Sequence, residues 1–334
     1  MDSAVAERAP VGGGFDSLIH EQLLDRRVRL ESARAHVSED KDFVRLLDEV
    51  DAALLRFESG AFGVCIDCKD AVEPDRLLVD PLMKVCLGCL NDKQRASLED
   101  DLQLAFDIQQ GLLPKVGVAC DRWSVHHAYE PAGIVSGDYV DIIERGDEFY
   151  FLLGDVSGKG MAASLLMSNL HAMFHSLVPL GLPLAELMSR ANRILCESSL
   201  ANQYATLICG KANREGEIEI SNAGHLSPIL MKHGVKGSVN CPGLPIGMFC
   251  DAEFIVNKIK VSSGDSLLLF SDGVTETMDL ESSEFGVDRL FAAIDCIEKG
   301  GPQAMIEKCL EHVAAFRNGA PRHDDLTMLA LSFV

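Results

Sequence analysis

The sequence predicts an α+β fold in which antiparallel strands pack with layers of helices, preceded by a helical hairpin that carries paired cysteines. Three observations support this prediction. Apolar residues recur at helical spacing near the N-terminus, two Cys-x2-Cys pairs follow, and from Trp123 onward turn-linked strand patterns occur with helices in two blocks. This order is typical of an antiparallel layered domain and not of a Rossmann alternation of strand and helix.

Length and composition fit a globular chain of more than one domain. The 334 residues are 47% hydrophobic and 24% charged, which allows substantial cores. The net charge of −21 argues against sequence-independent nucleic-acid binding and against an anionic membrane surface. Residues 1–14 lack the apolar core of a signal peptide, and no apolar run is long enough to span a membrane. The 11 cysteines, most of them isolated, are typical of a reducing compartment, so we expect a cytoplasmic protein.

The N-terminal part is predicted to form a helical hairpin. Residues 1–14 end in three glycines and are expected to be a disordered tail. Helical patterns follow at about 17–36 and 41–58, with a turn at 37–40. Together with the cysteine pairs, this hairpin is expected to form a domain over residues 15–94.

The cysteine pairs are the most specific motif of this region. Cys65 and Cys68 are separated by two residues, 17 residues follow, and Cys86 and Cys89 repeat the spacing. Each pair can direct two thiolates at one ion, and two pairs complete a closed tetrahedral shell, which is characteristic of structural Zn²⁺. A redox dithiol would account for one pair but not for both.

Residues 46–94 also resemble the zinc-finger domain of the DksA/TraR family of RNA-polymerase regulators. The likeness rests on the helix that leads into a Gly-x-Phe-Gly-x-Cys-x2-Cys motif, on the turn Pro74–Leu77 and on the closing cysteine pair. Residues 38–43 lack the Asp-x2-Asp-x-Ala pattern that DksA carries at the tip of its coiled coil. The resemblance therefore implies a zinc module but does not favour polymerase regulation.

A continuous helix is predicted over about residues 91–113, and Pro114 ends it. Five of its residues alternate four and three apart and form a short heptad seam: Leu98, Leu102, Ala105, Gln109 and Leu112. Two interpretations remain open, because one face could pack on the following domain or join two copies of the chain. We predict that residues 95–113 are a linker and dimerisation helix, with a homodimer formed through residues 91–113.

Acidic residues stand at the ends of three predicted strands in the C-terminal part. Asp155 and Asp272 each end an apolar strand, and Asp324 and Asp325 come directly before another. If that last strand runs antiparallel to the strand before Asp272, both sets of carboxylates meet at one end of the sheet. Gathered carboxylates repel one another unless a hard cation lies between them, so the pattern predicts a Mg²⁺ or Mn²⁺ site. Asp also suits turns, but three such strand ends favour the metal interpretation.

The region from the end of the predicted helix to residue 334 resembles the SpoIIE/RsbU branch of the metal-dependent Ser/Thr phosphatases, the PPM family. The motifs occur in family order and include EPAGIVSGDYVD, FLLGDVSGKGMAASLLM, ISNAGHLSP, LLLFSDGVTE and HDDLTMLAL. The resemblance implies a phosphatase domain over residues 114–334, built as an antiparallel β-sandwich flanked by helix layers. It also implies a site for two Mn²⁺ or Mg²⁺ ions.

By the same resemblance, the carbonyl of Val156 is a metal ligand, and Asp325 is a further candidate ligand at a position where many relatives have Asn. Four carboxylates are implied as both metal ligands and catalytic residues: Asp138, Asp155, Asp272 and Asp324. The implied reaction is hydrolysis of phosphoserine or phosphothreonine on a regulatory protein, typically an anti-sigma-factor antagonist, by water that two metal ions activate. The alternative is an RNA-polymerase-binding transcription regulator that acts through the zinc module and has an inactive phosphatase fold.

Other motifs are weaker. The segment GDVSGKG lacks the spacing of a P-loop. His171 and His175 lie four apart on a predicted helix, without a Glu after the first, and are interpreted as packing or surface residues. His225 is interpreted as ordering a loop beside the site, with catalysis as the alternative. Ser157 stands where some relatives have a histidine that is a candidate general acid.

Overall fold

The computed structural model describes residues 13–34, 41–115, 119–120, 122–198, 203–295 and 300–334. The chain divides into two compact units, which meet between Asp101 and Leu102. The predicted tail up to residue 12 and the predicted turn 37–40 lie outside the described residues. Gly13 and Gly14, which the sequence placed in that tail, belong to the first helix.

The first unit contains the predicted hairpin and the cysteine module. Its elements are α1 Gly13–Arg34, α2 Lys41–Glu58, α3 Pro74–Val79, the 3₁₀-helix Leu87–Cys89 and the start of α4, Asp92–Leu112. Ile19 and Leu23 of α1 are fully buried in one core with Val50 and Leu54 of α2. Each pair is spaced by four residues, so each lies on one helix face, which is why the two helices pack along their length.

The second unit is built on two antiparallel sheets. The strand order is β1-β2-β11-β10-β7-β8 in one sheet and β3-β4-β5-β6-β9 in the other. The strands are β1 Ala119–Cys120, β2 Trp123–Glu130, β3 Tyr139–Arg145, β4 Glu148–Val156, β5 Ala205–Asn213, β6 Glu217–Ala223, β7 Ile229–Lys232, β8 Val235–Ser238, β9 Asn257–Lys260, β10 Ser266–Phe270 and β11 Leu326–Phe333. The helices are α5 Gly160–Leu177, the 3₁₀-helix Val178–Leu180, α6 Leu184–Ser198, α7 Asp272–Thr275, α8 Gly286–Asp295 and α9 Pro302–Arg317.

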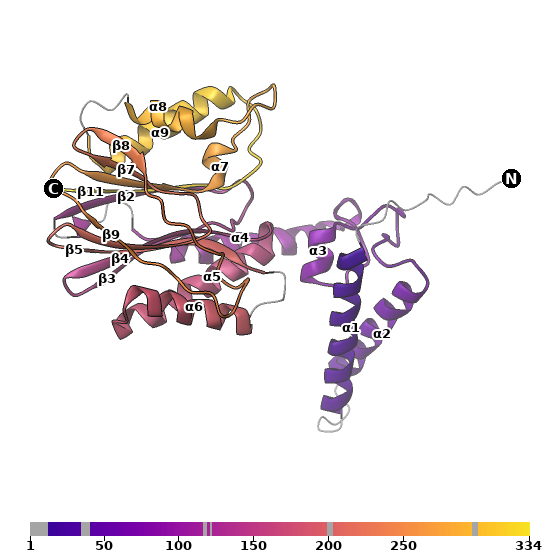
Figure 1. Cartoon of the computed structure of the whole chain (residues 1–334). Helices are drawn as coiled ribbons and strands as arrows, with labels where there is room; N and C mark the ends of the chain where they lie inside the picture. The colour runs from indigo at the N-terminus through magenta and orange to yellow at the C-terminus, as the bar shows by residue number, and fades with distance from the viewer. Residues whose placement is uncertain (1–12, 35–40, 116–118, 121, 199–202, 296–299) are drawn as a thin grey trace. The chain divides into compact units, whose positions relative to one another are not determined.

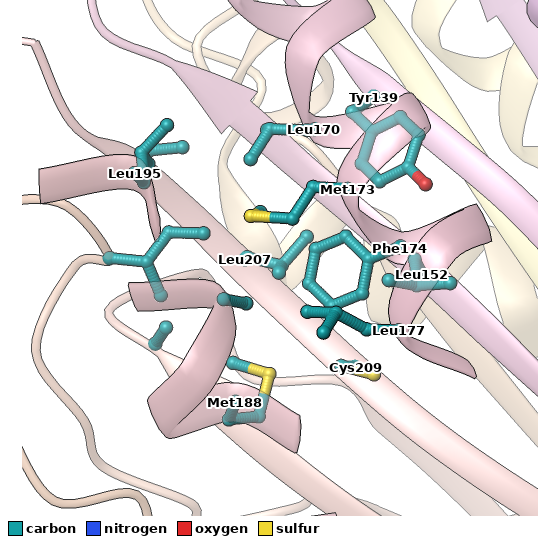
Figure 2. Packing of buried hydrophobic residues seen from close by; sticks show 14 of the residues in the cluster. Tyr139, Leu152, Leu170, Met173, Phe174, Leu177, Met188, Leu195, Leu207 and Cys209 are labelled. Atoms are coloured by element: carbon teal, nitrogen blue, oxygen red, sulfur yellow. The ribbon is translucent and has the colours of Figure 1, made fainter. Parts of the chain in front are cut away.

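The two sheets are stacked between helix layers, with α5 and α6 on the five-stranded sheet and α8 and α9 on the six-stranded sheet (Figure 1). The central strands carry long apolar runs because both of their faces are buried. In β4, Leu152 packs with Leu170 and Phe174 of α5 (Figure 2), whereas Phe151 and Leu153 belong to the core between the sheets. Successive side chains of a strand point to opposite faces, so such a strand shows a continuous apolar run instead of an alternation.

The predicted layered α+β fold is confirmed, and the differences are local. The pattern of residues 252–261 predicts a strand over that whole range, but only Asn257–Lys260 pairs, with β6. Phe254 lies before that strand and is buried in the core against α5 and α6, so its apolar character reflects packing and not strand pairing. The unpredicted strand β8 carries a single apolar residue, Val235, which is exposed at the sheet edge.

Candidate active site

Asp272, Asp324 and Asp325 lie at one end of the six-stranded sheet. Strands β10 and β11 pair in antiparallel fashion, with Phe270 opposite Met328, so the end of one lies beside the start of the other. Gly273 packs so closely on this segment that a Cβ there would collide with the carbonyl oxygen of Asp325. The predicted meeting of the two strand ends is therefore confirmed.

The other two candidate carboxylates come from the five-stranded sheet. Asp138 comes directly before β3. Asp155 is the second-to-last residue of β4, the strand that pairs with β3. Gly137 directly precedes Asp138 and lies close to the end of β4. A Cβ added at Gly137 would be 3.3 Å from the Val156 carbonyl oxygen and 3.6 Å from Asp155 Oδ1. A glycine at this place lets the backbone before Asp138 lie against the two predicted donor groups of β4.

Electrostatics show that the carboxylates of the two sheets share one environment. Burial, followed by the negative charges of Asp272, Asp324 and Asp325, raises the pKa of Asp155 from 3.8 to about 7. The pKa of Asp272 is also raised, first by burial and then by Asp324. In the protein alone, this arrangement therefore disfavours full ionisation of the cluster.

Asp138 is the most deeply buried member of the cluster, with 1% of its surface exposed. Burial raises its pKa well above the ordinary value, and the charge of Asp155 adds to this, although a hydrogen bond from Thr327 opposes it. Thr327 Oγ1 donates to Asp138 Oδ2 at 2.5 Å, and the Asp138 amide donates to Ser136 Oγ at 3.0 Å. These bonds fix the carboxylate between β3 and β11.

The carboxylate of Asp325 is engaged by the backbone of the segment before β3. Its Oδ1 accepts a hydrogen bond from the Ala132 amide at 2.7 Å, and its Oδ2 accepts one from the Gly137 amide at 3.0 Å. Asp325 thus links the six-stranded sheet to the loop that carries Asp138. Both oxygens already bind amide groups, so a role in positioning this loop is compatible with its chemistry whether or not it also binds a metal.

Lys159 places a positive charge at the edge of the cluster. Its Nζ lies 2.7 Å from Asp324 Oδ2 and 2.9 Å from the carbonyl oxygen of His323. The hydrogen bond to Asp324 is the main reason why the pKa of Lys159 is raised. The ammonium group therefore offsets part of the negative charge of the cluster in the protein without metal.

The donor groups of the cluster fit a hard divalent cation. They are carboxylate oxygens from Asp138, Asp155, Asp272 and Asp324 together with the Val156 carbonyl, and Mg²⁺ and Mn²⁺ prefer such oxygen donors. Burial and, after it, the neighbouring carboxylates raise the pKa values of Asp155 and Asp272, and a cation would offset the cost of keeping these groups ionised. The assignment of individual residues as ligands remains a prediction.

His225 and Ser157 connect the segments around the site through hydrogen bonds. Thr206 lies opposite Asp155 in the β4–β5 pair, and its Oγ1 is 2.8 Å from His225 Nδ1. His225 Nε2 lies 3.1 Å from the Phe270 carbonyl, and burial lowers the pKa of this histidine to about 4. With both ring nitrogens engaged, His225 acts as a tether, which favours the loop-ordering interpretation. Ser157 Oγ accepts a hydrogen bond from the amide of Tyr204 at 3.0 Å, so this hydroxyl also connects loops.

A cavity of about 640 Å³ opens beside Asp324 and Lys159. Apolar side chains of α9, among them Leu310 and Val313, form part of its wall. Charged residues surround the opening: Glu130, Lys159, Glu276, Glu307, Arg317 and Arg322. A phosphorylated side chain bound at the carboxylates would therefore have a cavity next to it for flanking residues.

In the first unit, Cys65, Cys68, Cys86 and Cys89 converge, with all four sulfur atoms within 4.8 Å of one another. Hydrogen bonds from the backbone amides of Cys68 and Cys86 lower the pKa of Cys65 to about 6, whereas the neighbouring thiols raise the pKa of Cys68 and Cys89. In the protein without metal, the thiolate that binds Zn²⁺ is therefore favoured at Cys65 and disfavoured at the other two. Arg56 of α2 donates to the carbonyls of Val64 and Met83, which attaches the module to the hairpin. The predicted four-sulfur arrangement is thus present.

Family models match a stretch of each unit of the chain. The family model described as Stage II sporulation protein E (SpoIIE) matches residues 145–334, and that of the prokaryotic dksA/traR C4-type zinc finger matches residues 60–95. The first match covers more than half of the chain. The chain belongs to the SpoIIE family. Its C-terminal unit is a protein serine/threonine phosphatase domain of the PPM type, and its N-terminal unit carries a DksA/TraR-type zinc finger, as the sequence predicted.

Relatives of this SpoIIE-family chain share modest identity with it. It is 24% identical to protein IcfG of Synechocystis sp. over 69% of this chain and 41% of IcfG, so it spans less than half of that protein. It is also 24% identical to the phosphoserine phosphatase RsbU of Bacillus subtilis over 70% of each chain.

Solved structures show the same fold. The SiaA-PP2C domain of Pseudomonas aeruginosa matches with a TM-score of 0.62 and 18% identity, over 72% of this chain and 98% of that domain. The PP2C domain of Bacillus subtilis SpoIIE, solved with a fragment of its regulatory domain, matches with a TM-score of 0.57 and 21% identity, over 64% and 63% of the two chains.

Two features of the site were not predicted from the sequence. Gln109 of α4 is buried, donates from Nε2 to the Ser136 carbonyl at 2.8 Å and accepts at Oε1 from the Ser136 amide at 3.0 Å. The sequence places Gln109 only in the heptad seam. A polar residue among the apolar seam positions is the one sign there of a hydrogen-bonding role. Lys159 lies in the motif GDVSGKG. The glycines of this motif predict a turn but give no indication that the lysine lies beside the carboxylates.

Proposed function

We propose that this chain hydrolyses phosphoserine or phosphothreonine on a regulatory protein, using water activated by two Mn²⁺ or Mg²⁺ ions. The observation that carries the proposal is the convergence of Asp138, Asp155, Asp272 and Asp324 from two sheets into one cluster with raised pKa values at Asp138, Asp155 and Asp272. The Val156 carbonyl adds a neutral oxygen donor.

A phosphomonoester dianion is repelled by bare carboxylates, so the reaction needs a positive centre among them. When bound, two divalent ions supply this charge, lower the pKa of water and stabilise the leaving oxygen. The protein's own residues position the donors. Thr327 fixes Asp138, Asp325 holds the loop before it, and Lys159 can bind phosphate oxygens at the edge of the cluster.

The substrate is proposed to be a phosphorylated protein resembling an anti-sigma-factor antagonist. The names of RsbU and RsbP, both phosphoserine phosphatases of Bacillus subtilis, support a phosphoserine substrate. The cavity beside Asp324 supports a peptide substrate, because its apolar wall and charged rim provide surface beyond what a phosphate alone would use.

The proposal is tested by phosphatase assay of the full chain on a serine-phosphorylated protein and on p-nitrophenyl phosphate, with and without Mn²⁺. Asp272→Asn is expected to reduce turnover by at least a hundredfold, because it removes a charged donor from the cluster. Asp147→Asn is the matched control, since Asp147 is an exposed carboxylate of the same domain, paired with Arg214. Metal-independent turnover, or equal activity of the two variants, would refute the proposed mechanism.

We further propose that the zinc module binds one structural Zn²⁺, that the protein is cytoplasmic and that α4 forms a homodimer. In the described part of the chain, no helix combines the length and apolarity needed to cross a membrane.

The dimer surface on α4 must differ from the predicted seam in its second half, because Gln109 and Leu112 pack within the phosphatase unit. Leu104 and Ile108, four residues apart and 59% and 55% exposed, are the better candidates for contact with a second copy.

A further inference from the structure

A second group of metal-binding side chains lies between strand β3 and helix α5. It consists of Asp141 of β3 with His171 and His175 of α5, whose donor atoms all lie within 4.8 Å of one another. Asp141 Oδ2 is 2.9 Å from His175 Nε2 and 3.2 Å from His171 Nδ1. From the sequence alone, the two histidines are expected to be packing or surface residues, and nothing in their spacing connects them with Asp141.

The fold explains why these three residues meet. His171 and His175 are one turn apart on α5 and therefore share a helix face, with ring centroids 4.1 Å apart. Asp141 alternates with Tyr139 and Ile143 along β3, and both of these pack in the core beneath α5. A carboxylate thus stands in an otherwise apolar layer, directly under the two imidazole rings.

The side chain of Asp141 is only 3% exposed, so the free-energy cost of burying its charge must be offset by hydrogen bonds or by a positive partner. The protein provides part of it through three hydrogen bonds: Oδ2 accepts from the Tyr139 hydroxyl and lies within hydrogen-bond distance of His175 Nε2, each at 2.9 Å, and Oδ1 accepts from the Ile142 amide at 2.8 Å. His171 Nδ1 is itself buried and makes no hydrogen bond of acceptable geometry, although it lies beside Oδ2. A buried nitrogen without a hydrogen bond, next to a carboxylate, is a polar atom that a ligand would satisfy.

We propose that Asp141, His171 and His175 form a binding site for a zinc-like transition-metal ion, separate from the carboxylate cluster. Two imidazoles and one carboxylate are a donor set that Zn²⁺ and its neighbours prefer, whereas the carboxylate cluster suits Mg²⁺ and Mn²⁺. Metal–ligand bonds of about 2.0–2.1 Å place tetrahedral donors roughly 3.3 Å apart. The separations of 2.9 and 3.2 Å are close to that value.

The surroundings of the group support this assignment. Burial lowers the pKa of His171, which favours the neutral imidazole that can bind a metal. The Tyr139 hydroxyl orients the carboxylate, as second partners commonly do for metal ligands. The side chain of His175 is 44% exposed, so an ion can enter from solvent and take water as a fourth ligand.

A bound ion would join two elements that flank the phosphatase centre. Strand β3 follows Asp138 directly, and α5 follows the turn after Asp155 that contains Lys159. The ion would fix the helix to the strand in addition to their apolar contacts. This inference does not depend on the proposed phosphatase activity, and zinc binding and thermal unfolding test it without an activity assay.

The test uses the full chain without a histidine tag, with excess Mg²⁺ to occupy the carboxylate cluster, and measures Zn²⁺ binding by competition with a chromogenic chelator. The variants are His171→Gln/His175→Gln and His175→Gln. His312→Gln on α9 is the control, because it removes a histidine that is not part of the group. The four-cysteine site remains intact in every protein and serves as an internal standard.

Wild type and His312→Gln are expected to bind one zinc ion more per chain than the double variant, at micromolar or lower concentration. Zinc should also raise the Tm of these two proteins and leave that of the double variant unchanged. If the double variant does not fold, His175→Gln is the deciding variant, because the side chain of His175 is partly exposed and its replacement should be tolerated. Its loss should weaken the binding of the additional zinc ion at least tenfold. Equal zinc content in all variants, or extra zinc bound only at millimolar concentration, would overturn the inference.

Discussion

Replacing Asp155 by Asn should make the metal-free protein more stable while it abolishes phosphatase activity. In the folded chain the pKa of Asp155 is raised from 3.8 to about 7, mainly by burial and then by the neighbouring carboxylates. The folded state therefore binds this proton more tightly than the unfolded chain does. Stability accordingly falls as the pH rises from about 4 to about 7, and the full penalty is present above pH 7. Asn carries no charge and escapes this penalty.

The size of the effect follows from the pKa difference. A difference of about 3 corresponds to roughly 4 kcal/mol at 1.36 kcal/mol per pH unit. The carboxylates titrate together, and Asn forfeits the favourable bond from the Val156 amide to the charged group, so the net gain is smaller. We expect about 1–3 kcal/mol at pH 8, which is about 2–12 °C in Tm for a domain of this size.

The assay is thermal unfolding of wild type and Asp155→Asn at pH 5 and pH 8, first in buffer without divalent cations and then with Mn²⁺. The variant should be the more stable protein at pH 8, and its advantage should shrink at pH 5, where wild-type Asp155 is protonated. Mn²⁺ at a thousand times its Kd should stabilise wild type by about 4.1 kcal/mol and reverse the order. A variant that is less stable than wild type at pH 8 without metal would show that the cluster is not electrostatically strained.

Three further predictions concern single contacts. Gln109→Leu removes both hydrogen bonds to the Ser136 backbone, which should destabilise the fold by about 1–3 kcal/mol and raise the Mn²⁺ concentration needed for half-maximal activity. Cys65→Ser should release the zinc of the N-terminal module, measured by elemental analysis, and leave the thermal transition of the phosphatase unit in place. Lys159→Ala removes a cation that competes for Asp324, so half-maximal activity should need several-fold less Mn²⁺.

Two of these predictions have a control variant on the same element or of the same residue type. Gln110→Leu changes an exposed neighbour of Gln109 on α4 and should leave stability and Mn²⁺ dependence unaltered. Cys309→Ser changes a buried cysteine of α9 that is remote from the zinc motif in sequence, so zinc should stay bound. Unchanged Mn²⁺ dependence in Lys159→Ala would show that its ammonium group does not compete with the ion.

The sequence predicted those parts of the molecule that depend on short stretches of chain. Asp272 and Asp324 could be placed together because each adjoins an apolar strand, and antiparallel pairing of those strands brings their ends side by side. The four cysteines could be grouped because metal-binding spacing is itself local. The role of Asp325 was not accessible in this way, since its amide partners at Ala132 and Gly137 lie far back in the sequence.

The group of Asp141, His171 and His175 shows what local patterns leave out. The spacing of the two histidines placed them on one helix face, but only the packing of α5 on β3 sets the carboxylate beneath them. Asp141 itself looked like an ordinary polar residue in a half-buried strand. The meeting of these residues depends on tertiary packing, which periodicity along one element does not encode.

Helix α4 provides a physical route from the first unit to the phosphatase centre. It is continuous from Asp92 to Leu112 and ends with Gln109 buried and bonded twice to Ser136, two residues before Asp138. Breaking a buried hydrogen bond leaves groups unsatisfied at about 1–3 kcal/mol, which is the range of typical coupling free energies between two sites. A rotation of α4 that separated Gln109 from Ser136 would therefore leave the loop that carries Asp138 attached through Asp325 but without its two bonds to α4.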